Sequence, residues 1–241
     1  MKTQKPWGLD KLTLQCIAMA SMLIDHIGAV LLPQYMILRV IGRLAFPIFA
    51  FFIAEGAALT HSYGKYLLRV ALFAVLTELP FDLAFQGRWI DPSYQNVLWT
   101  FAIALCAIRL LKLGEGKKPA VYGFFASLAA LLGYVVATVL ETDYGGWGVV
   151  MVLAFYICRD RKNVWLLRTC IIVGINCVAF GGWQALMNGA ITVQSFAVLT
   201  LPLLAFYNGQ PGRKSKAIQY GCYAFYPVHL LLLGLVAAYL L

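Results

Sequence analysis

The chain has 241 residues, of which 62% are hydrophobic and only 12% are charged, and its mean hydropathy is +0.79. Soluble domains are about half apolar and about a quarter charged, so this composition excludes an ordinary soluble protein and indicates an integral membrane protein. The net charge of +9 would suggest a nucleic-acid partner in a soluble chain. No basic helix or zinc-finger spacing is present, so we expect no nucleic acid and take the lipid bilayer of an inner or plasma membrane as the partner.

Apolar runs occupy most of the chain and lack the period of two that is typical of barrel strands. They cover residues 13–32, 36–60, 65–84, 95–112, 119–140, 146–158, 163–181, 192–207 and 219–240. A bilayer core about 30 Å thick needs roughly 20 apolar residues per helix, so the runs predict a polytopic all-α protein with about nine transmembrane helices. Indistinct ends of the seventh and eighth runs leave a count of about eight open. With short loops throughout, residues 1–241 are expected to form a single transmembrane domain.

The distribution of basic residues predicts the orientation of the chain in the membrane. Most of the 19 lysines and arginines fall in alternate loops, counted from the N-terminus, and the other side keeps only Arg39, Arg43 and Arg88. Because lysine and arginine are enriched in cytoplasmic loops, we expect a cytoplasmic N-terminus. The odd number of spans and the absence of a visible repeat argue against the two equal inverted halves of many secondary transporters.

The first three spans contain ionisable residues that are costly in a bilayer and are therefore functional candidates. They are Asp25, His26, Arg39, Arg43, Glu55, Glu78 and Asp82. At about 1.5 Å per residue, most of these lie at a similar depth in the outer half of the bilayer. Two interpretations are open: a structural ion-pair network, or the lining of an active site in which the arginines bind an anion or a carbonyl and His26 transfers protons.

Other polar residues of the spans and outer loops have both a structural and a functional interpretation. His229 lies in the last span after Pro227, either as a hydrogen-bonded core residue or as part of the site. Asn96, Asp143 and Tyr144 are expected at outer helix ends, as caps or as the lining of a cavity mouth. The three histidines stand in three separate segments without a carboxylate at ligand spacing, so we predict no metal site.

Six short motifs in a fixed order resemble the TraX family over nearly the whole chain. They are residues 24–28 (IDHIG), 38–51 (LRVIGRLAFPIFAF), 96–101 (NVLWTF), 143–145 (DYG), 207–212 (YNGQPG) and 225–230 (FYPVHL). The resemblance implies an integral membrane acyltransferase that takes an acetyl or other acyl group from cytoplasmic acyl-CoA, the donor substrate. The acceptor would be an amine or hydroxyl at the outer side, on a protein N-terminus, a glycan or a small molecule. The named member of this conjugation-associated family acetylates the pilin N-terminus, and His26 matches a central intramembrane histidine of related acyltransferases.

The residues and the resemblance together suggest a mechanism. We expect His26, beside Asp25, to remove a proton from the acceptor, with an acyl-histidine intermediate as the alternative. Arg43, with Arg39 or His229, would stabilise the oxyanion, and Glu78 or Asp82 would orient the imidazole. The phosphates of acyl-CoA would meet basic residues near the cytoplasmic ends of the spans, although these residues also serve as topology signals. The basic candidates are Lys65, Arg69, Lys112 and Arg168.

Two other functions fit the same sequence. A proton-coupled membrane carrier would also place acids, arginines and histidines inside the bilayer, and it predicts solute flux that does not depend on CoA. A non-catalytic component of a conjugation or export machine predicts no acyl-CoA binding and a tolerant position 26.

Overall fold

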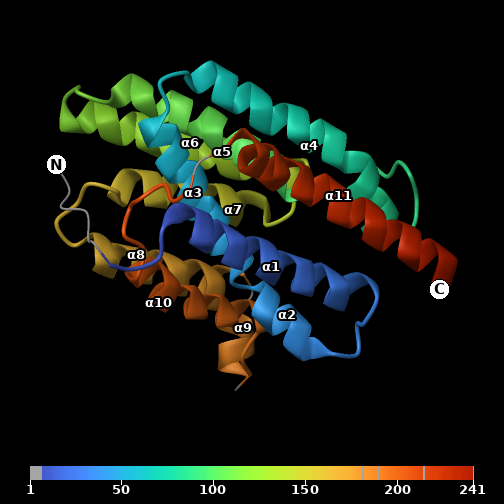
Figure 1. The fold of residues 1–241 in the computed structure, drawn as a ribbon. Helices are drawn as coiled ribbons and strands as arrows, with labels where there is room; N and C mark the ends of the chain where they lie inside the picture. Colours follow the sequence, from blue (N-terminus) through green and yellow to red (C-terminus); the bar gives the residue numbers. More distant parts are fainter. Residues whose placement is uncertain (1–6, 181, 189, 214, 241) are drawn as a thin grey trace. The chain divides into compact units, whose positions relative to one another are not determined.

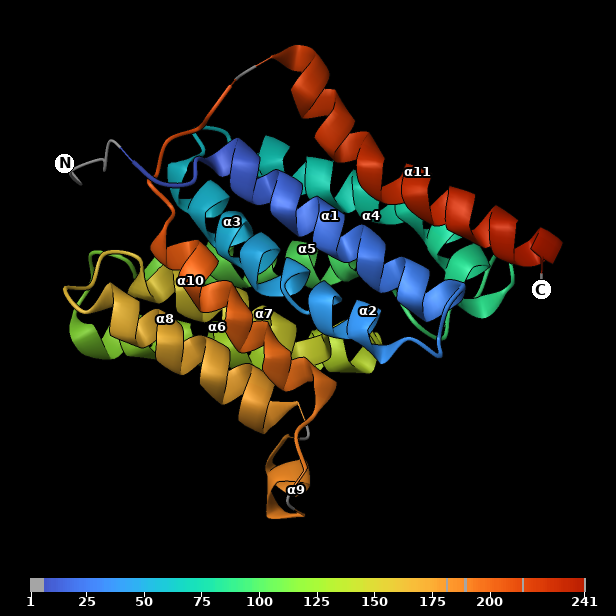
Figure 2. The ribbon, with the colours of Figure 1, turned by 60° about the horizontal axis from the view of Figure 1, so that its bottom comes forward.

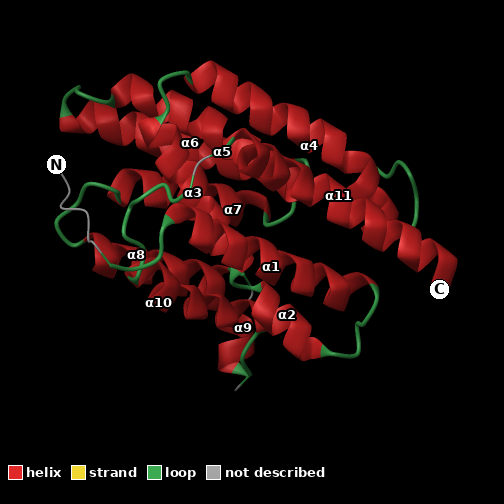
Figure 3. Cartoon of the chain, in the orientation of Figure 1, coloured by secondary structure: helices red, strands yellow, loops and turns green. Residues whose placement is uncertain are grey.

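The computed structural model describes residues 7–180, 182–188, 190–213 and 215–240. Helices and loops make up this part of the chain, and no strand of a sheet occurs in it (Figure 3). The all-α prediction is therefore confirmed for the described residues.

The helices follow one another with mostly short connections (Figure 1). They are α1 (Lys11–Val30), α2 (Met36–Gly42), α3 (Ala45–Leu59), α4 (Tyr63–Gln86), α5 (Val97–Leu111), η1 (Lys112–Gly114), α6 (Pro119–Val139), α7 (Gly145–Cys158), α8 (Val164–Val173), η2 (Gly174–Ala179), α9 (Gly182–Met187), η3 (Val193–Leu199), α10 (Thr200–Ala205) and α11 (Lys216–Leu240). Among them η1 and η3 are 3-10 helices, and η2 is a π-helix.

Five segments of the described chain are long and apolar enough to cross a membrane. They are Lys11–Val30, Met36–Leu59, Val97–Gly114, Pro119–Val139 and Tyr220–Tyr239. Shorter apolar helices occupy Gly145–Cys158, Val164–Ala179 and Val193–Ala205. These helices support a membrane protein, whereas the count of about nine spans and the cytoplasmic N-terminus stay predictions.

The second predicted span is not one continuous helix. It divides into α2 and α3 at Arg43 and Leu44. Pro47 supplies the physical reason: proline has no N–H to donate to the carbonyl of Arg43, four residues earlier, and its ring would clash with that carbonyl. The seventh and eighth predicted spans are also irregular, since α8 continues into the π-helix η2 and α10 follows the 3-10 helix η3.

The described residues belong to two compact units. Unit 1 comprises Met1–Phe49, Pro80–Trp89 and Trp165–Leu241, as far as these ranges are described, and unit 2 comprises Ala50–Leu79 and Ile90–Val164. We describe each unit by itself.

In unit 1, α1 packs against α2 and α11, and α1 and α11 are the first and last long helices of the unit (Figures 1 and 2). Glycines permit the close approach of these helices. A Cβ at Gly28 would lie 2.7 Å from that of Leu38, and a Cβ at Gly234 would lie 2.9 Å from Cγ of Leu83 in α4. At Gly42 a Cβ would overlap the side chain of Asp25.

In unit 2, α5, α6 and α7 pack against one another. Small residues again permit the contact, because a Cβ at Gly133 of α6 would lie 2.7 Å from the Val149 side chain of α7. The centre of this unit is apolar and includes Leu105, Ile108 and Val152, all completely buried. Burial of such side chains stabilises the unit against separation of its helices.

Replacing Gly42 by alanine should destabilise unit 1, because the new methyl group would displace the Asp25 side chain from its position between α1 and α2. Overpacking of this kind costs about 1–3 kcal/mol. We expect a lower midpoint of thermal unfolding in detergent, measured by tryptophan fluorescence. Gly123→Ala in α6 is the matched control, since a Cβ there meets open space. Equal midpoints for the two variants would contradict the close contact at Gly42.

Candidate functional site

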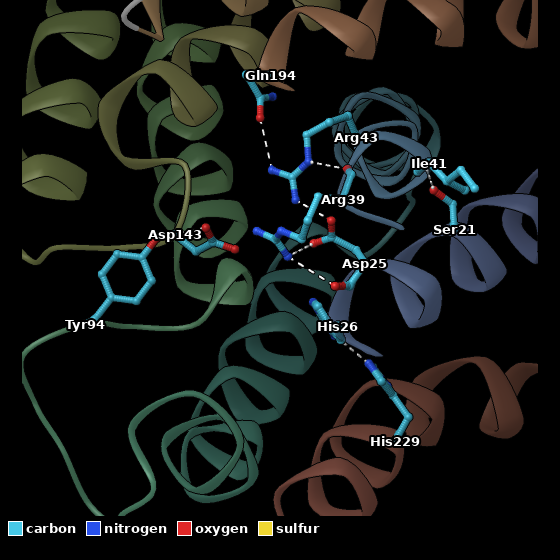
Figure 4. A network of polar contacts seen from close by, with 10 residues as sticks. All are labelled: Ser21, Asp25, His26, Arg39, Ile41, Arg43, Tyr94, Asp143, Gln194 and His229. Atoms are coloured by element: carbon cyan, nitrogen blue, oxygen red, sulfur yellow. Dashed lines mark hydrogen bonds and ion pairs between the residues drawn. The ribbon is translucent and has the colours of Figure 1, made fainter. Parts of the chain in front are cut away.

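Helix α1 carries two adjacent polar residues in the interior of unit 1. Asp25 is 7% exposed and His26 is 9% exposed, although both stand in a helix that is otherwise mostly apolar. Successive residues on a helix point about 100° apart, so the two side chains reach different neighbours. Their contacts define two polar clusters, drawn in Figure 4.

The Asp25 carboxylate binds two arginines. Its Oδ2 lies 2.7 Å from NH1 of Arg39, and its Oδ1 lies 2.5 Å from NH2 of Arg43. NH1 of Arg39 also donates to the backbone carbonyl of Asp25 at 3.1 Å. Each carboxylate oxygen therefore accepts a charge-assisted hydrogen bond from a different guanidinium. Because Arg39 is in α2 and Arg43 is the C-cap residue of α2, these two bonds join α1 to α2.

Arg43 is further held by an amide relay that extends to the π-helix η2. NH1 of Arg43 donates to Oε1 of Gln194 at 3.1 Å, and Nε2 of Gln194 donates to Oδ1 of Asn176 at 2.7 Å. Asn176 is completely buried, and its Nδ2 donates to the carbonyl of Ile172 at 2.8 Å. Because that carbonyl can only accept, the orientation of both amides is fixed, and Gln194 must present its oxygen to Arg43.

His26 contacts a second histidine from the other end of the chain. Its Nδ1 lies 2.7 Å from Nε2 of His229 in α11, which is 6% exposed. The ring planes differ by 8° and the centroids are 5.0 Å apart, so the 2.7 Å contact between nitrogens runs end to end and the rings are not stacked face to face. Nδ1 of His229 in turn lies 2.7 Å from the carbonyl oxygen of Phe225.

Aromatic rings surround the two imidazoles. Phe85 meets His26 edge to face with centroids 5.3 Å apart, and Phe225 stacks on His229 at 4.7 Å. Tyr226 is tilted against both imidazoles, at 6.1 Å from His26 and 5.7 Å from His229. Such contacts restrict the ring orientations and keep the hydrogen bond in a largely apolar environment.

Unit 2 contains its own buried polar cluster around Glu78. Oε2 of Glu78 accepts from Nδ2 of Asn96 at 2.6 Å and from Nε1 of Trp99 at 2.7 Å. Asn96 is completely buried, and its Oδ1 accepts from the backbone N–H of Leu98 at 3.0 Å. The structure therefore gives Asn96 the role of N-cap of α5, one of the two interpretations of this residue.

The turn before α7 contains Asp143 and Tyr144. The hydroxyl of Tyr94 donates to Oδ1 of Asp143 at 2.9 Å, and burial together with this carboxylate raises the pKa of Tyr94 well above its ordinary value. Tyr144 and Glu141 have φ angles of 63° and 51°, in the left-handed region. Such backbone costs about 1 kcal/mol or more for each non-glycine residue, and it often occurs at functional turns.

The four basic residues expected near acyl-CoA lie on three different elements, α4, η1 and α8. Lys65 and Arg69 are exposed on α4, Lys112 follows α5, and Arg168 is half-buried on α8. The ammonium of Lys112 donates to the carbonyl of Ala57 at 2.9 Å and lies 4.5 Å from the ring centre of Tyr63. These contacts give Lys112 a local partner in unit 2.

Comparison with known proteins identifies the family of the chain. Residues 10–237 match the family described as TraX protein. The chain belongs to the TraX family. A relative from Dichelobacter nodosus, described as "Probable fimbrial assembly protein FimC, serogroup H1", is 30% identical over 240 residues that cover 91% of this chain and 92% of the relative. An uncharacterized protein of Rickettsia prowazekii (strain Madrid E) is 28% identical over 165 residues, which cover 67% of this chain and 60% of that protein. No solved structure matches the chain.

In this TraX-family chain, unit 1 brings together five of the predicted site residues: Asp25, His26, Arg39, Arg43 and His229. Asp82 is buried in the same unit, whereas Glu78, Asn96, Asp143 and Tyr144 belong to unit 2. The hydrogen-bond partner of His26 is His229, and the orienting roles expected of Glu78 and Asp82 stay predictions. In the described part of the chain, no group of three or more histidines, cysteines or acids is placed to hold a metal ion.

Two residues of the TraX-family site were missed by sequence reasoning. Gln194 and Asn176 stand in the irregular seventh and eighth apolar runs, where uncharged amides attract less attention than ionisable groups. The available signal was the presence of two amides in runs that are otherwise apolar, because an amide buried there needs a partner.

Replacing Asp25 by asparagine should strongly destabilise unit 1. The variant leaves two guanidinium groups beside a neutral amide, and removal of one partner from a buried ion pair costs about 3–5 kcal/mol. Asp160→Asn is the matched control, because the Asp160 side chain is 69% exposed and its contact with Arg159 lies on the surface. We expect at most about 1 kcal/mol from that change. Stability is measured by thermal and denaturant unfolding. Equal losses of stability in the Asp25→Asn and Asp160→Asn variants would contradict a structural role for the Asp25 ion pair.

Proposed function

We propose that the protein is a membrane acyltransferase that moves an acyl group from acyl-CoA to an acceptor amine or hydroxyl, with His26 as general base. The observation that carries this proposal is the buried imidazole of His26, which follows directly after an aspartate bound to two arginines. Membership of the TraX family supports it.

The reaction needs one base, one acid and a stabiliser of negative charge. His26 takes the proton from the acceptor nitrogen or oxygen as that atom attacks the thioester carbonyl carbon. The tetrahedral intermediate then collapses, the carbon–sulfur bond breaks, and the CoA sulfur receives the proton from the imidazolium of His26. The products are the acylated acceptor and free CoA, and the histidine is neutral again.

Arg39 and Arg43 are suited to stabilise the oxyanion of the intermediate. Both guanidiniums are held in place by Asp25, and Arg43 is also held by Gln194. Preorganised donors in a site of low polarity stabilise developing charge without a cost for reorientation. The side chain of Arg39 is 31% exposed and that of Arg43 is 12% exposed, so Arg39 is the more accessible donor.

The donor and acceptor approach from opposite sides in this proposal. With a cytoplasmic N-terminus in an inner or plasma membrane, the phosphates of acyl-CoA would bind at basic residues near the cytoplasmic ends of the helices. The acceptor would enter from the outer side. The name of the Dichelobacter nodosus relative, which links that protein to fimbrial assembly, supports one choice among the possible acceptors. We propose the amino terminus of a pilus or fimbrial subunit as the acceptor.

Replacing His26 by alanine should reduce CoA release from acetyl-CoA by about 100- to 10,000-fold, the contribution of a positioned general base. The assay uses purified protein in detergent with a peptide that carries a free pilin-type amino terminus. CoA is quantified by chromatography, because the chain itself contains six free cysteines. His26→Gln, closer in volume, covers the case in which the alanine variant fails to fold.

His61→Ala is the matched control, since this exposed histidine lies in the turn after α3. It should release CoA at the wild-type rate. A peptide with an acetylated amino terminus should give no transfer. Unchanged CoA release in both His26 variants would rule out the general base, and wild-type protein that neither binds nor consumes acetyl-CoA would rule out the acyltransferase.

A further inference from the structure

We propose that His229 is a positioning residue that fixes the tautomer of His26, so that Nε2 of His26 is the basic nitrogen of the site. The inference rests on the proposed function for its catalytic consequence, whereas the tautomer itself is a property of the resting protein. It follows from two consecutive contacts along the two imidazoles.

The relay begins at a backbone carbonyl. Nδ1 of His229 lies 2.7 Å from the oxygen of Phe225. A carbonyl oxygen can only accept a hydrogen bond, so Nδ1 of His229 carries a hydrogen. In a neutral imidazole the other nitrogen then has the lone pair, and Nε2 of His229 is an acceptor.

The second contact transfers this constraint to His26. Its Nδ1 lies 2.7 Å from Nε2 of His229, and two acceptors at this distance would repel. Nδ1 of His26 therefore carries a hydrogen and donates it. The lone pair of neutral His26 is left on Nε2, which has no hydrogen-bond partner among the described residues.

The reverse arrangement requires a charged His229. If both nitrogens of His229 carried hydrogens, Nε2 of His229 would donate to His26, and the lone pair of His26 would be on Nδ1. That state places an imidazolium, 6% exposed and without a carboxylate partner in the described chain, on an apolar membrane helix. Burial of an unpaired charge is expensive, so the neutral relay is the stable one.

The relay also suits the charged state that catalysis would create. When Nε2 of His26 takes a proton from the acceptor, Nδ1 keeps its hydrogen and its bond to His229, so no ring has to turn. The Phe85 and Phe225 rings restrict both imidazoles, and Gly234 allows α11 to pack closely on Leu83. Both nitrogens of His229 are used in this relay, which leaves none for an oxyanion. His229 thus acts through His26.

The tautomer can be measured without any activity. The chain has only three histidines, so a long-range proton–nitrogen NMR spectrum of protein labelled with nitrogen-15 in its histidine rings contains three ring systems. His26→Gln and His61→Ala assign the signals. We expect His26 to show a protonated Nδ1 and an unprotonated Nε2. An unprotonated Nδ1 with a protonated Nε2 would overturn the inference.

Two substitutions of His229 test its positioning role. Phenylalanine removes the acceptor, whereas glutamine offers an amide oxygen that can accept from Nδ1 of His26. We expect the phenylalanine variant to lose the fixed tautomer and to lower the rate of CoA release by up to about 100-fold, with the KM for acetyl-CoA unchanged. The glutamine variant should recover part of both properties. Val228→Ala, on the exposed face of the same helix, should change neither.

Failure of the inference and failure of the proposed function give different results. Wild-type protein that transfers acyl groups but carries the Nε2–H tautomer of His26 would overturn only the relay. A fixed Nδ1–H tautomer in protein that never consumes acetyl-CoA would overturn only the acyltransferase. Equal rates in the phenylalanine and glutamine variants would overturn the positioning role, whatever the tautomer.

Discussion

The Asp25 carboxylate between two guanidinium groups is the interaction on which unit 1 depends. A buried carboxylate is tolerated only when its oxygens are bound, and here each oxygen accepts from a different arginine. This requirement sets the register of α1 against α2, because only one alignment brings Arg39 and Arg43 to the same acid. It also explains Gly42, whose missing side chain provides the space for the carboxylate. Pro47 prevents the helix from continuing beyond the pair and so leaves Arg43 as its C-cap.

The ion pair and the imidazole share one helix turn, so the constraint extends to the chemistry. The ion pair of Asp25 fixes α1, and His26 of the same helix contacts His229 of α11. Gly234 lets α11 come close to Leu83 of α4. The amide relay from Asn176 through Gln194 ends at NH1 of Arg43. The π-helix that carries Asn176 fits this picture, because π-helical segments frequently occur at functional sites. The guanidinium groups are therefore held by Asp25 of α1 and by Gln194 of η3, and Gln194 is itself held by Asn176 of the π-helix.

Sequence patterns predict features that follow from the cost of burying polar groups. They do not predict which helices are neighbours in the fold. Charged residues in apolar runs are expensive, so hydropathy suggests that Arg39 and Arg43 pair with buried acids, but it does not tell which of the candidate acids they reach. The run 36–60 predicts one span, and the break at Arg43 and Leu44 is explained by Pro47, which lacks the N–H that a continuous helix needs. In contrast, His26 and His229 are 203 residues apart, and hydropathy does not tell which helices are neighbours. Amides such as Gln194 cost less to bury than charges, so they stand out less in an apolar run.

The two polar clusters of unit 1 differ in one respect that bears on function. In the arginine cluster, Asp25, Gln194 and Asn176 all have hydrogen-bond partners, as the low polarity of a membrane interior demands. In the histidine pair, the relay uses both nitrogens of His229 but only one of His26, and Nε2 of His26 has no partner within the described residues. The histidine pair therefore leaves one basic nitrogen available at the end of a chain of two hydrogen bonds. Local departures from full satisfaction are expected at reactive positions, and this nitrogen therefore suits the proposed role of His26 as general base.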